Sequence, residues 1–336
     1  MKFARSGCAA TQHGGCLYTY DAKDGLLNVI GITKQRQNGI KRRAILLENN
    51  HELIAFFDLK YTHMQFDFSF AFGNSVISFD NHADHSQLRL CLSGKRNMGI
   101  EKLKDIFFFL WEMLYFCIGF FPKLQYISFD GVEDQLYPKR IARHRSTTEN
   151  LSLKGSYNRL CGISIENLNG VTLRKYQALK AELETALNSI FAVQSYKDIY
   201  GEHRLLLASQ AAEGIIEGKY DSAIAKANRS FRGRIEFLFA PLLTADRKHK
   251  TKLFRSIGLT KMKYFELLKE TRHFYTHCNR ERKRFTKGTE FVADYWILSI
   301  AVRLFIMQEI GMQYDGQLLR INALSIASWM TKYRKQ

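Results

Sequence analysis

Residues 64–72 read MQFDFSFAF, a run in which phenylalanines alternate with small or polar residues. Successive side chains of an extended chain point to opposite faces. One face therefore collects the aromatic residues Phe66, Phe68, Phe70 and Phe72. Strict alternation of this kind is typical of a strand with one buried and one exposed face. The stretch predicts a half-buried β-strand.

Other short runs rich in β-branched or aromatic residues lie on both sides of this strand, separated by turn-forming residues. They are LLNVIGITK (26–34), RRAILLE (42–48), ELIAFFDLKY (52–61), SVISFD (75–80), QLRLCLS (87–93) and KLQYISFDG (123–131). Regular strands at short spacing favour an antiparallel sheet, arranged as a sandwich or as a barrel-like structure.

A long apolar run interrupts the strands. IFFFLWEMLYFCIGFF (106–121) lies within a helix predicted over about residues 99–120. The run is only 16 residues long and contains Glu112, whereas a membrane span needs about 20 apolar residues. We expect a deeply buried helix and no membrane partner.

The cysteines and the N-terminus bear on the cellular compartment. Six cysteines are scattered without a CxxC pair, and the first residues, MKFARSGCAATQ, contain no apolar leader. Scattered cysteines in a chain of this size are typical of reduced thiols, and a secretory signal needs an apolar segment. The sequence predicts a cytoplasmic protein.

Helical spacing begins at about residue 172, with TLRKYQALKAELETALNSIFAV. Further helices are predicted at about 203–217, 221–240, 245–256, 259–279, 289–312 and 317–332, with glycines at or near several junctions. Short connections favour an antiparallel bundle. The fold class is therefore α+β, with a β-rich N-terminal domain (antiparallel sheet plus helices) over residues 1–198 and an α-helical domain over residues 199–336.

The formal net charge of +18 is distributed unevenly. Residues 201–336 contain 25 Lys and Arg against 13 Asp and Glu, a balance of +12, while residues 1–200 contribute only +6. A positive surface of this size attracts a phosphate polyanion. The same charge is also compatible with solubility and weak nonspecific adhesion alone.

The helix predicted at 259–279 contains the densest group of reactive side chains, ETRHFYTHCN (270–279). Thr260 is a suitable N-cap. A helical wheel places on one buried stripe Tyr264, Leu267, Leu268, Thr271, Phe274, Tyr275 and Cys278. On the opposite side it places Glu266, Glu270, His273 and His277. Arg272 lies on the flank, about 140° around the helix from His277.

Three interpretations of this group remain open. The first is an RNA-cleaving site, in which a histidine moves protons near neutral pH and an arginine binds the phosphate. The second is a metal site, because Glu270, His273 and His277 share a face. A di-metal bundle needs a second Glu-x-x-His element, and the other one here, Glu48 to His51, lies in the β-rich part. We therefore predict no metal and no cofactor. The third is an ordinary charged helix face.

The residues LLKETRHFYTHCN (267–279) resemble the signature of the HEPN superfamily. That signature is an arginine followed by a polar residue and then a histidine, with four to six residues between arginine and histidine. Arg272, His273 and His277 fit it with four intervening residues. The family fold is a helical bundle with the motif on a late helix, and HRLLLASQAAEGIIEG (203–218) is similar to its first helix. Active members commonly have asparagine where this chain has His273.

A β-rich part before a HEPN bundle is also similar to the ApeA type of anti-phage abortive-infection protein. The resemblance implies a metal-independent endoribonuclease that acts as a defence or toxin effector on RNA, including tRNA as a candidate. His277 would be the general acid and base, Arg272 would bind the phosphate, and His273 would orient the substrate or share proton transfer.

The resemblance further implies a homodimer formed through the helical domain, and an N-terminal domain that senses a phage or regulatory trigger. Past the motif, the basic stretch NRERKRFTKG would follow the RNA backbone through Arg280, Arg282, Lys283, Arg284 and Lys287. The alternative function is a non-catalytic RNA- or nucleotide-binding adaptor module of the same superfamily.

Overall fold

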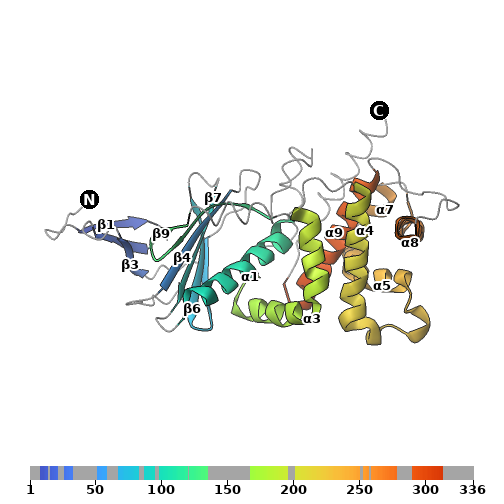
Figure 1. Ribbon diagram of the computed structural model, residues 1–336, viewed down its shortest axis with the longest axis horizontal. Coiled ribbons are helices and arrows are strands. Elements are labelled where there is room, and N and C mark those ends of the chain that lie inside the picture. The colour runs from blue at the N-terminus through green and yellow to red at the C-terminus, as the bar shows by residue number, and fades with distance from the viewer. Residues whose placement is uncertain are drawn as a thin grey trace, which may run out of the picture.

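The computed structural model describes residues 8–13, 16–21, 26–32, 51–58, 67–82, 87–94, 98–119, 121–134, 167–195, 201–249, 253–256, 259–277 and 290–312. Strands gather toward the N-terminal end of the molecule and helices toward the C-terminal end, with one helix, α1 (Ile100–Ile118), against the sheet (Figure 1). The α+β class predicted from the sequence is confirmed at this level.

A small antiparallel sheet comes first in the chain. Its strands are β1 (Cys8–His13), β2 (Cys16–Asp21) and β3 (Leu26–Ile32), paired in the order β1-β2-β3. Only β3 was among the predicted strands. The sequences of β1 and β2, CAATQH and CLYTYD, contain few large apolar residues, so they show little of the alternation on which the prediction relied.

A second antiparallel sheet has six strands in the order β5-β6-β7-β4-β8-β9. These are β4 (His51–Asp58), β5 (Asp67–Phe72), β6 (Ser75–His82), β7 (Gln87–Gly94), β8 (Lys123–Phe129) and β9 (Val132–Glu133). The hairpin between β8 and β9 turns at Asp130 and Gly131, with φ of 48° and 78°. Asp-Gly is the pair that adopts two such positive angles most readily. The predicted strand at 42–48 lies outside the described residues.

The alternation that predicts β5 is confirmed over residues 67–72. Asp67, Ser69 and Ala71 are exposed, while Phe72 is buried and the other two phenylalanines are partly buried. In the described residues the sheet is open, with β5 and β9 at its edges. The helix α1 covers its apolar face, where the Phe57 ring lies 5.9 Å from that of Phe107 and 5.7 Å from that of Trp111. The expected sandwich or barrel is therefore replaced here by a helix packed on a sheet.

The helical part begins with α3 (Gly170–Ser195) and α4 (Gly201–Ile215), which is continued by a π-helical turn (Ile216–Tyr220). Two short 3₁₀ turns follow (Asp221–Ala223 and Lys226–Asn228). The remaining described helices are α5 (Phe231–Leu238), α6 (Ala240–His249), α7 (Leu253–Ser256), α8 (Lys261–His277) and α9 (Glu290–Glu309). The predicted helix at 317–332 lies outside the described residues.

Two predicted helices were wrong in their extent. The segment 221–240 is α-helical only from Phe231 onward. Ser230 caps this new helix, and its Oγ accepts a hydrogen bond from the Gly233 amide at 3.3 Å. The segment 245–256 is divided between α6 and α7, and α6 already begins at Ala240. Apolar spacing indicates helix content here, but the capping residue decides where each helix starts.

The helix α1 is a core element, as predicted. Its Glu112 is fully buried and accepts hydrogen bonds from Tyr176 Oη at 3.0 Å and from Lys180 Nζ at 2.8 Å, both on α3. None of the helices among the described residues is both long enough and apolar enough to cross a membrane.

The sheet layer and the helical part meet through α1, α3 and α9. Arg303 of α9 donates from Nε to the Phe116 carbonyl and from Nη2 to the Cys117 carbonyl, both at 2.8 Å, at the C-terminal end of α1. α3 kinks at Leu183 (φ −117°, ψ 19°) and its bend is visible in Figure 1. The predicted boundary at residue 198 lies between α3 and α4, outside the described residues, and stays a prediction.

Candidate functional site

The helix α8 contains the predicted motif and begins where the sequence indicates. Thr260 caps it, with Oγ1 accepting from the Lys263 amide at 3.2 Å. Tyr264 Oη donates to the Asp294 carbonyl at 3.0 Å and so links α8 to α9. Burial, together with the nearby Asp294 carboxylate, raises the pKa of Tyr264 well above its usual value. The phenol is therefore a neutral structural donor.

The buried face of α8 differs from the predicted stripe. Tyr264, Leu268 and Thr271 are buried as expected, and so is Phe265, which the wheel placed outside the stripe. Leu267, Phe274 and Tyr275 are only partly buried. The face that packs on the bundle is thus rotated toward the flank that carries Arg272.

Arg272 lies where α8 meets α4 and α5. Its Nη2 is 2.6 Å from Glu213 Oε2 on α4, and its guanidinium carbon lies 4.8 Å from the centre of the Phe231 ring on α5. The side chain is 25% exposed. Its Nε is buried and has no hydrogen-bond acceptor among the residues that the structure describes. The arginine is therefore held on one edge and one face, and the exposed part of its side chain remains accessible.

Glu213 is shared between two arginines. Its Oε1 accepts from Arg234 Nη1 of α5 at 3.0 Å, while Arg234 also pairs with Glu217 at 3.1 Å and with Asp221 at 3.0 Å. Arg234 thus faces three carboxylates, and Glu213 uses its other oxygen, Oε2, to fix the orientation of Arg272. The sequence analysis missed this partner because α4 and α8 are distant along the chain and only the tertiary fold brings them together.

The other predicted site residues are placed only in part. His273 lies on α8 beside Arg272 and is partly buried. His277 is the last residue of α8, and its side chain is outside the described set. Helix geometry puts position 277 about 140° around the α8 axis from position 272. The predicted RNA-binding residues, Arg280, Arg282, Lys283, Arg284 and Lys287, all lie outside the described residues.

The metal interpretation gains no support from the described side chains, among which no three His, Cys, Asp or Glu residues gather as metal ligands. The trio of Glu270, His273 and His277 is not tested by this finding, because the His277 side chain is not described. In the N-terminal part, His51 Nδ1 pairs with Asp130 Oδ2 at 2.7 Å.

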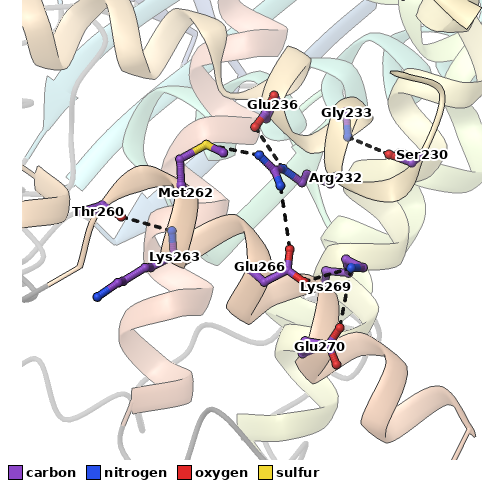
Figure 2. Close-up of polar contacts among 10 residues, drawn as sticks. All are labelled: Ser230, Arg232, Gly233, Glu236, Thr260, Met262, Lys263, Glu266, Lys269 and Glu270. Carbon is purple, nitrogen blue, oxygen red and sulfur yellow. Dashed lines mark hydrogen bonds and ion pairs between the residues drawn. The ribbon is translucent and has the colours of Figure 1, made fainter. Parts of the chain in front are cut away.

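A row of charged side chains runs along the contact between α5 and α8 (Figure 2). Arg232 of α5 reaches toward Glu266 of α8, and Glu266 in turn accepts from Lys269 at 2.9 Å. A cavity of about 470 Å³ opens beside this row, lined by Ile224, Asn228, Ser230, Arg232, Gly233, Glu236 and Phe237.

Comparison with known proteins returned no match of any of the three kinds sought, whether a family model, a curated protein or a solved structure. The functional argument therefore rests on the residues and their geometry.

Proposed function

We propose that this protein is a metal-independent endoribonuclease of the HEPN type, which acts on RNA in the cytoplasm as a defence or toxin effector. The observation that carries the proposal is the placement of Arg272. It belongs to an arginine–histidine motif on a late helix of a helical part, and it is oriented by Glu213 and Phe231 while its side chain remains 25% exposed. A fixed guanidinium of this kind suits a phosphate oxygen.

The chemistry requires no enzyme nucleophile. His277 takes the proton from the ribose 2′-OH, the 2′-oxygen attacks the adjacent phosphorus, and the bond to the 5′-oxygen breaks. The leaving oxygen receives a proton from an acid, a role that a histidine near its pKa can also fill. Arg272 binds the nonbridging oxygens, whose charge grows in the transition state. His273 orients the substrate or shares proton transfer. The products are a 2′,3′-cyclic phosphate and a 5′-hydroxyl.

The geometry of α8 makes a homodimer part of the proposal. Positions 272 and 277 lie about 140° apart on the helix, so they do not share one smooth face of α8 in a single copy. Two copies related by a two-fold axis through the helical part would combine an arginine of one copy with a histidine of the other. In this arrangement the N-terminal sheet layer senses a trigger, and its contact with the bundle through Arg303 offers a route for coupling.

A second function is favoured by the same ion pair. Because Glu213 lies 2.6 Å from Arg272, it neutralises part of the charge that a phosphate would need. A non-catalytic RNA- or nucleotide-binding adaptor tolerates this better than a catalyst does. In that case RNA would bind but remain intact.

The test incubates the purified protein with total RNA and with tRNA in EDTA, beside a His277→Ala variant. The proposal predicts cleavage in EDTA with cyclic phosphate ends, and a loss of at least about 100-fold in the variant. Activity abolished by EDTA and restored by a divalent metal would support the metal interpretation. Cleavage that survives the substitution would remove His277 from the mechanism. Light scattering of the same sample measures the predicted dimer.

A further inference from the structure

The cavity beside α5 combines two kinds of wall. Arg232, Glu236, Asn228 and Ser230 provide hydrogen-bonding groups, and Ile224 and Phe237 provide apolar surface. Its volume of about 470 Å³ falls in the range that accommodates small organic ligands. The lining is mainly polar, with Ile224 and Phe237 as its apolar members, and convergent polar groups fix the orientation of a ligand.

The guanidinium of Arg232 contacts Glu236, Met262 and Glu266, as Figure 2 shows. Its Nε lies 3.3 Å from Glu236 Oε1, its Nη1 lies 4.0 Å from Glu266 Oε2, and its Nη2 points to the Met262 sulfur at 3.3 Å. A thioether is a weak acceptor, and 4.0 Å is longer than a hydrogen bond. Arg232 therefore keeps donors available for a ligand.

Hydrogen bonds to backbone carbonyls hold the cavity wall in place. The Asn228 amide donates to the Ala225 carbonyl at 2.7 Å, and Arg229 Nε donates to the Ile224 carbonyl at 3.2 Å. A Cβ on Gly233 would lie 1.9 Å from the Asn228 carbonyl oxygen, so the 3₁₀ turn packs directly on the first turn of α5. Little ordering is then left for a ligand to induce, which favours binding.

The cavity adjoins the proposed cleavage site. Phe231 places its ring 4.8 Å from the Arg272 guanidinium carbon, and the next residue, Arg232, lines the cavity. Consecutive Cα atoms are about 3.8 Å apart, so both features begin on the first turn of α5, although successive side chains of a helix point about 100° apart. An RNA chain bound at Arg272 therefore also passes the turn of α5 that contributes to the cavity.

We propose that the cavity binds a nucleobase of the RNA substrate and that it selects guanine. The Glu236 carboxylate accepts from the N1–H and the exocyclic N2 amine of guanine, while Arg232 or Asn228 donates to its O6 or N7. Ile224 and Phe237 contact the faces of the ring. Adenine presents one donor on this edge, the exocyclic N6 amine, beside the acceptor N1, so it leaves one carboxylate oxygen unpaired. Single-stranded RNA bases are read in this way, by stacking and by their edges. This inference rests on the proposed RNA substrate and adds its base specificity.

Isothermal titration of the wild-type protein with guanosine 5′-monophosphate and adenosine 5′-monophosphate tests the proposal. The two ligands share a phosphate and a ribose, so a difference between them reports on the base alone. Neither contains a phosphodiester, so binding does not depend on cleavage. We expect saturable binding of the guanosine nucleotide and at least about tenfold weaker binding of the adenosine nucleotide.

The matched variants are Glu236→Gln and Glu101→Gln, which make the same change at a partly buried position of α5 and at an exposed position of α1. Glu236→Gln is expected to weaken the guanosine nucleotide about tenfold or more, and Glu101→Gln to leave it unchanged. Equal affinity for the two nucleotides, no saturable binding, or insensitivity to Glu236→Gln would overturn the proposal. If RNA is cleaved while the nucleotide does not bind, only the base pocket fails. If the nucleotide binds while RNA stays intact in EDTA, the nuclease fails instead.

Discussion

Two arginines in this molecule occupy contrasting environments. Arg303 is 3% exposed and donates to two backbone carbonyls of α1. Its role is structural, because these bonds link α9 of the helical part to the helix that packs on the sheet. Arg272 is 25% exposed, contacts a carboxylate and an aromatic face, and retains a buried Nε without an acceptor in the part of the chain described. A fully paired arginine fixes the fold, whereas a partly paired one can bind a ligand.

The surroundings of the two arginines extend the contrast. Elsewhere on α1, the fully buried Glu112 pairs with Lys180, whose side chain is 18% exposed. Near Arg272 several charged groups form a network around Glu213 and Arg234, which are 12% and 13% exposed. We expect changes in the first region to act on stability, and changes in the second to act on both stability and binding.

The largest stability effect is expected at the buried pair. Lys180→Met should lower the free energy of unfolding by about 3–5 kcal/mol, because Glu112 keeps its charge in the core without its cation. Urea unfolding followed by tryptophan fluorescence measures it. The control is Lys104→Met, whose partner Glu101 is 84% exposed, and a loss below about 1 kcal/mol is expected. Equal losses of unfolding free energy in the two variants would refute the distinction between the buried ion pair and the exposed one.

A smaller effect is expected at the C-terminal end of α1. Gly119 has a φ of 97°, and a Cβ there would lie 2.6 Å from Arg303 Nη1. Gly119→Ala should cost about 2–3 kcal/mol, from the left-handed backbone and the displaced arginine. The control Gly99→Ala sits at the other end of α1, with no atom within 4 Å of the added Cβ. If thermal or urea unfolding shows no loss of stability in Gly119→Ala, the contacts of Arg303 with α1 do not stabilise the fold.

The shared carboxylate comes next. Glu213→Gln keeps the shape but removes the charge that joins Arg234 to Arg272, and a loss of about 2 kcal/mol is expected. Glu217→Gln, on the more exposed partner of Arg234 at 59%, should lose less than about 1 kcal/mol. If both variants unfold like the wild type, Glu213 does not hold Arg272 in place.

The smallest effect is expected at Tyr264 and depends on pH. Tyr264→Phe should cost about 1 kcal/mol at pH 8, by loss of the bond to the Asp294 carbonyl. Since burial raises the pKa of Tyr264 above its unfolded value near 10, the stability from the neutral phenol is complete below pH 10. It is lost as pH rises above 10, because the unfolded chain then releases the proton more readily. The difference between wild type and variant should therefore shrink between pH 8 and pH 11, and a constant difference would contradict this.

The elements that the sequence predicts well are those with a local periodicity. The alternation at residues 67–72 and the apolar helix α1 report burial directly, and Thr260 marks the start of α8 by its capping chemistry. The segment 221–240 was mispredicted because the cap at Ser230 outweighs apolar spacing. The contact of Arg272 with Glu213 joins separate helices, and no local pattern encodes it.

The assignment of a functional role to Arg272 is tested most directly by comparing Arg272→Met with Arg303→Met for both RNA cleavage in EDTA and unfolding. The account predicts that Arg272→Met loses at least about 100-fold in cleavage while its free energy of unfolding falls by no more than the loss of about 2 kcal/mol expected for Glu213→Gln. It predicts that Arg303→Met is chiefly destabilised. The account is contradicted if Arg272→Met cleaves RNA within a few-fold of the wild-type rate and has an unfolding midpoint as low as that of Arg303→Met. Arg272 would then have a structural role and not a functional one.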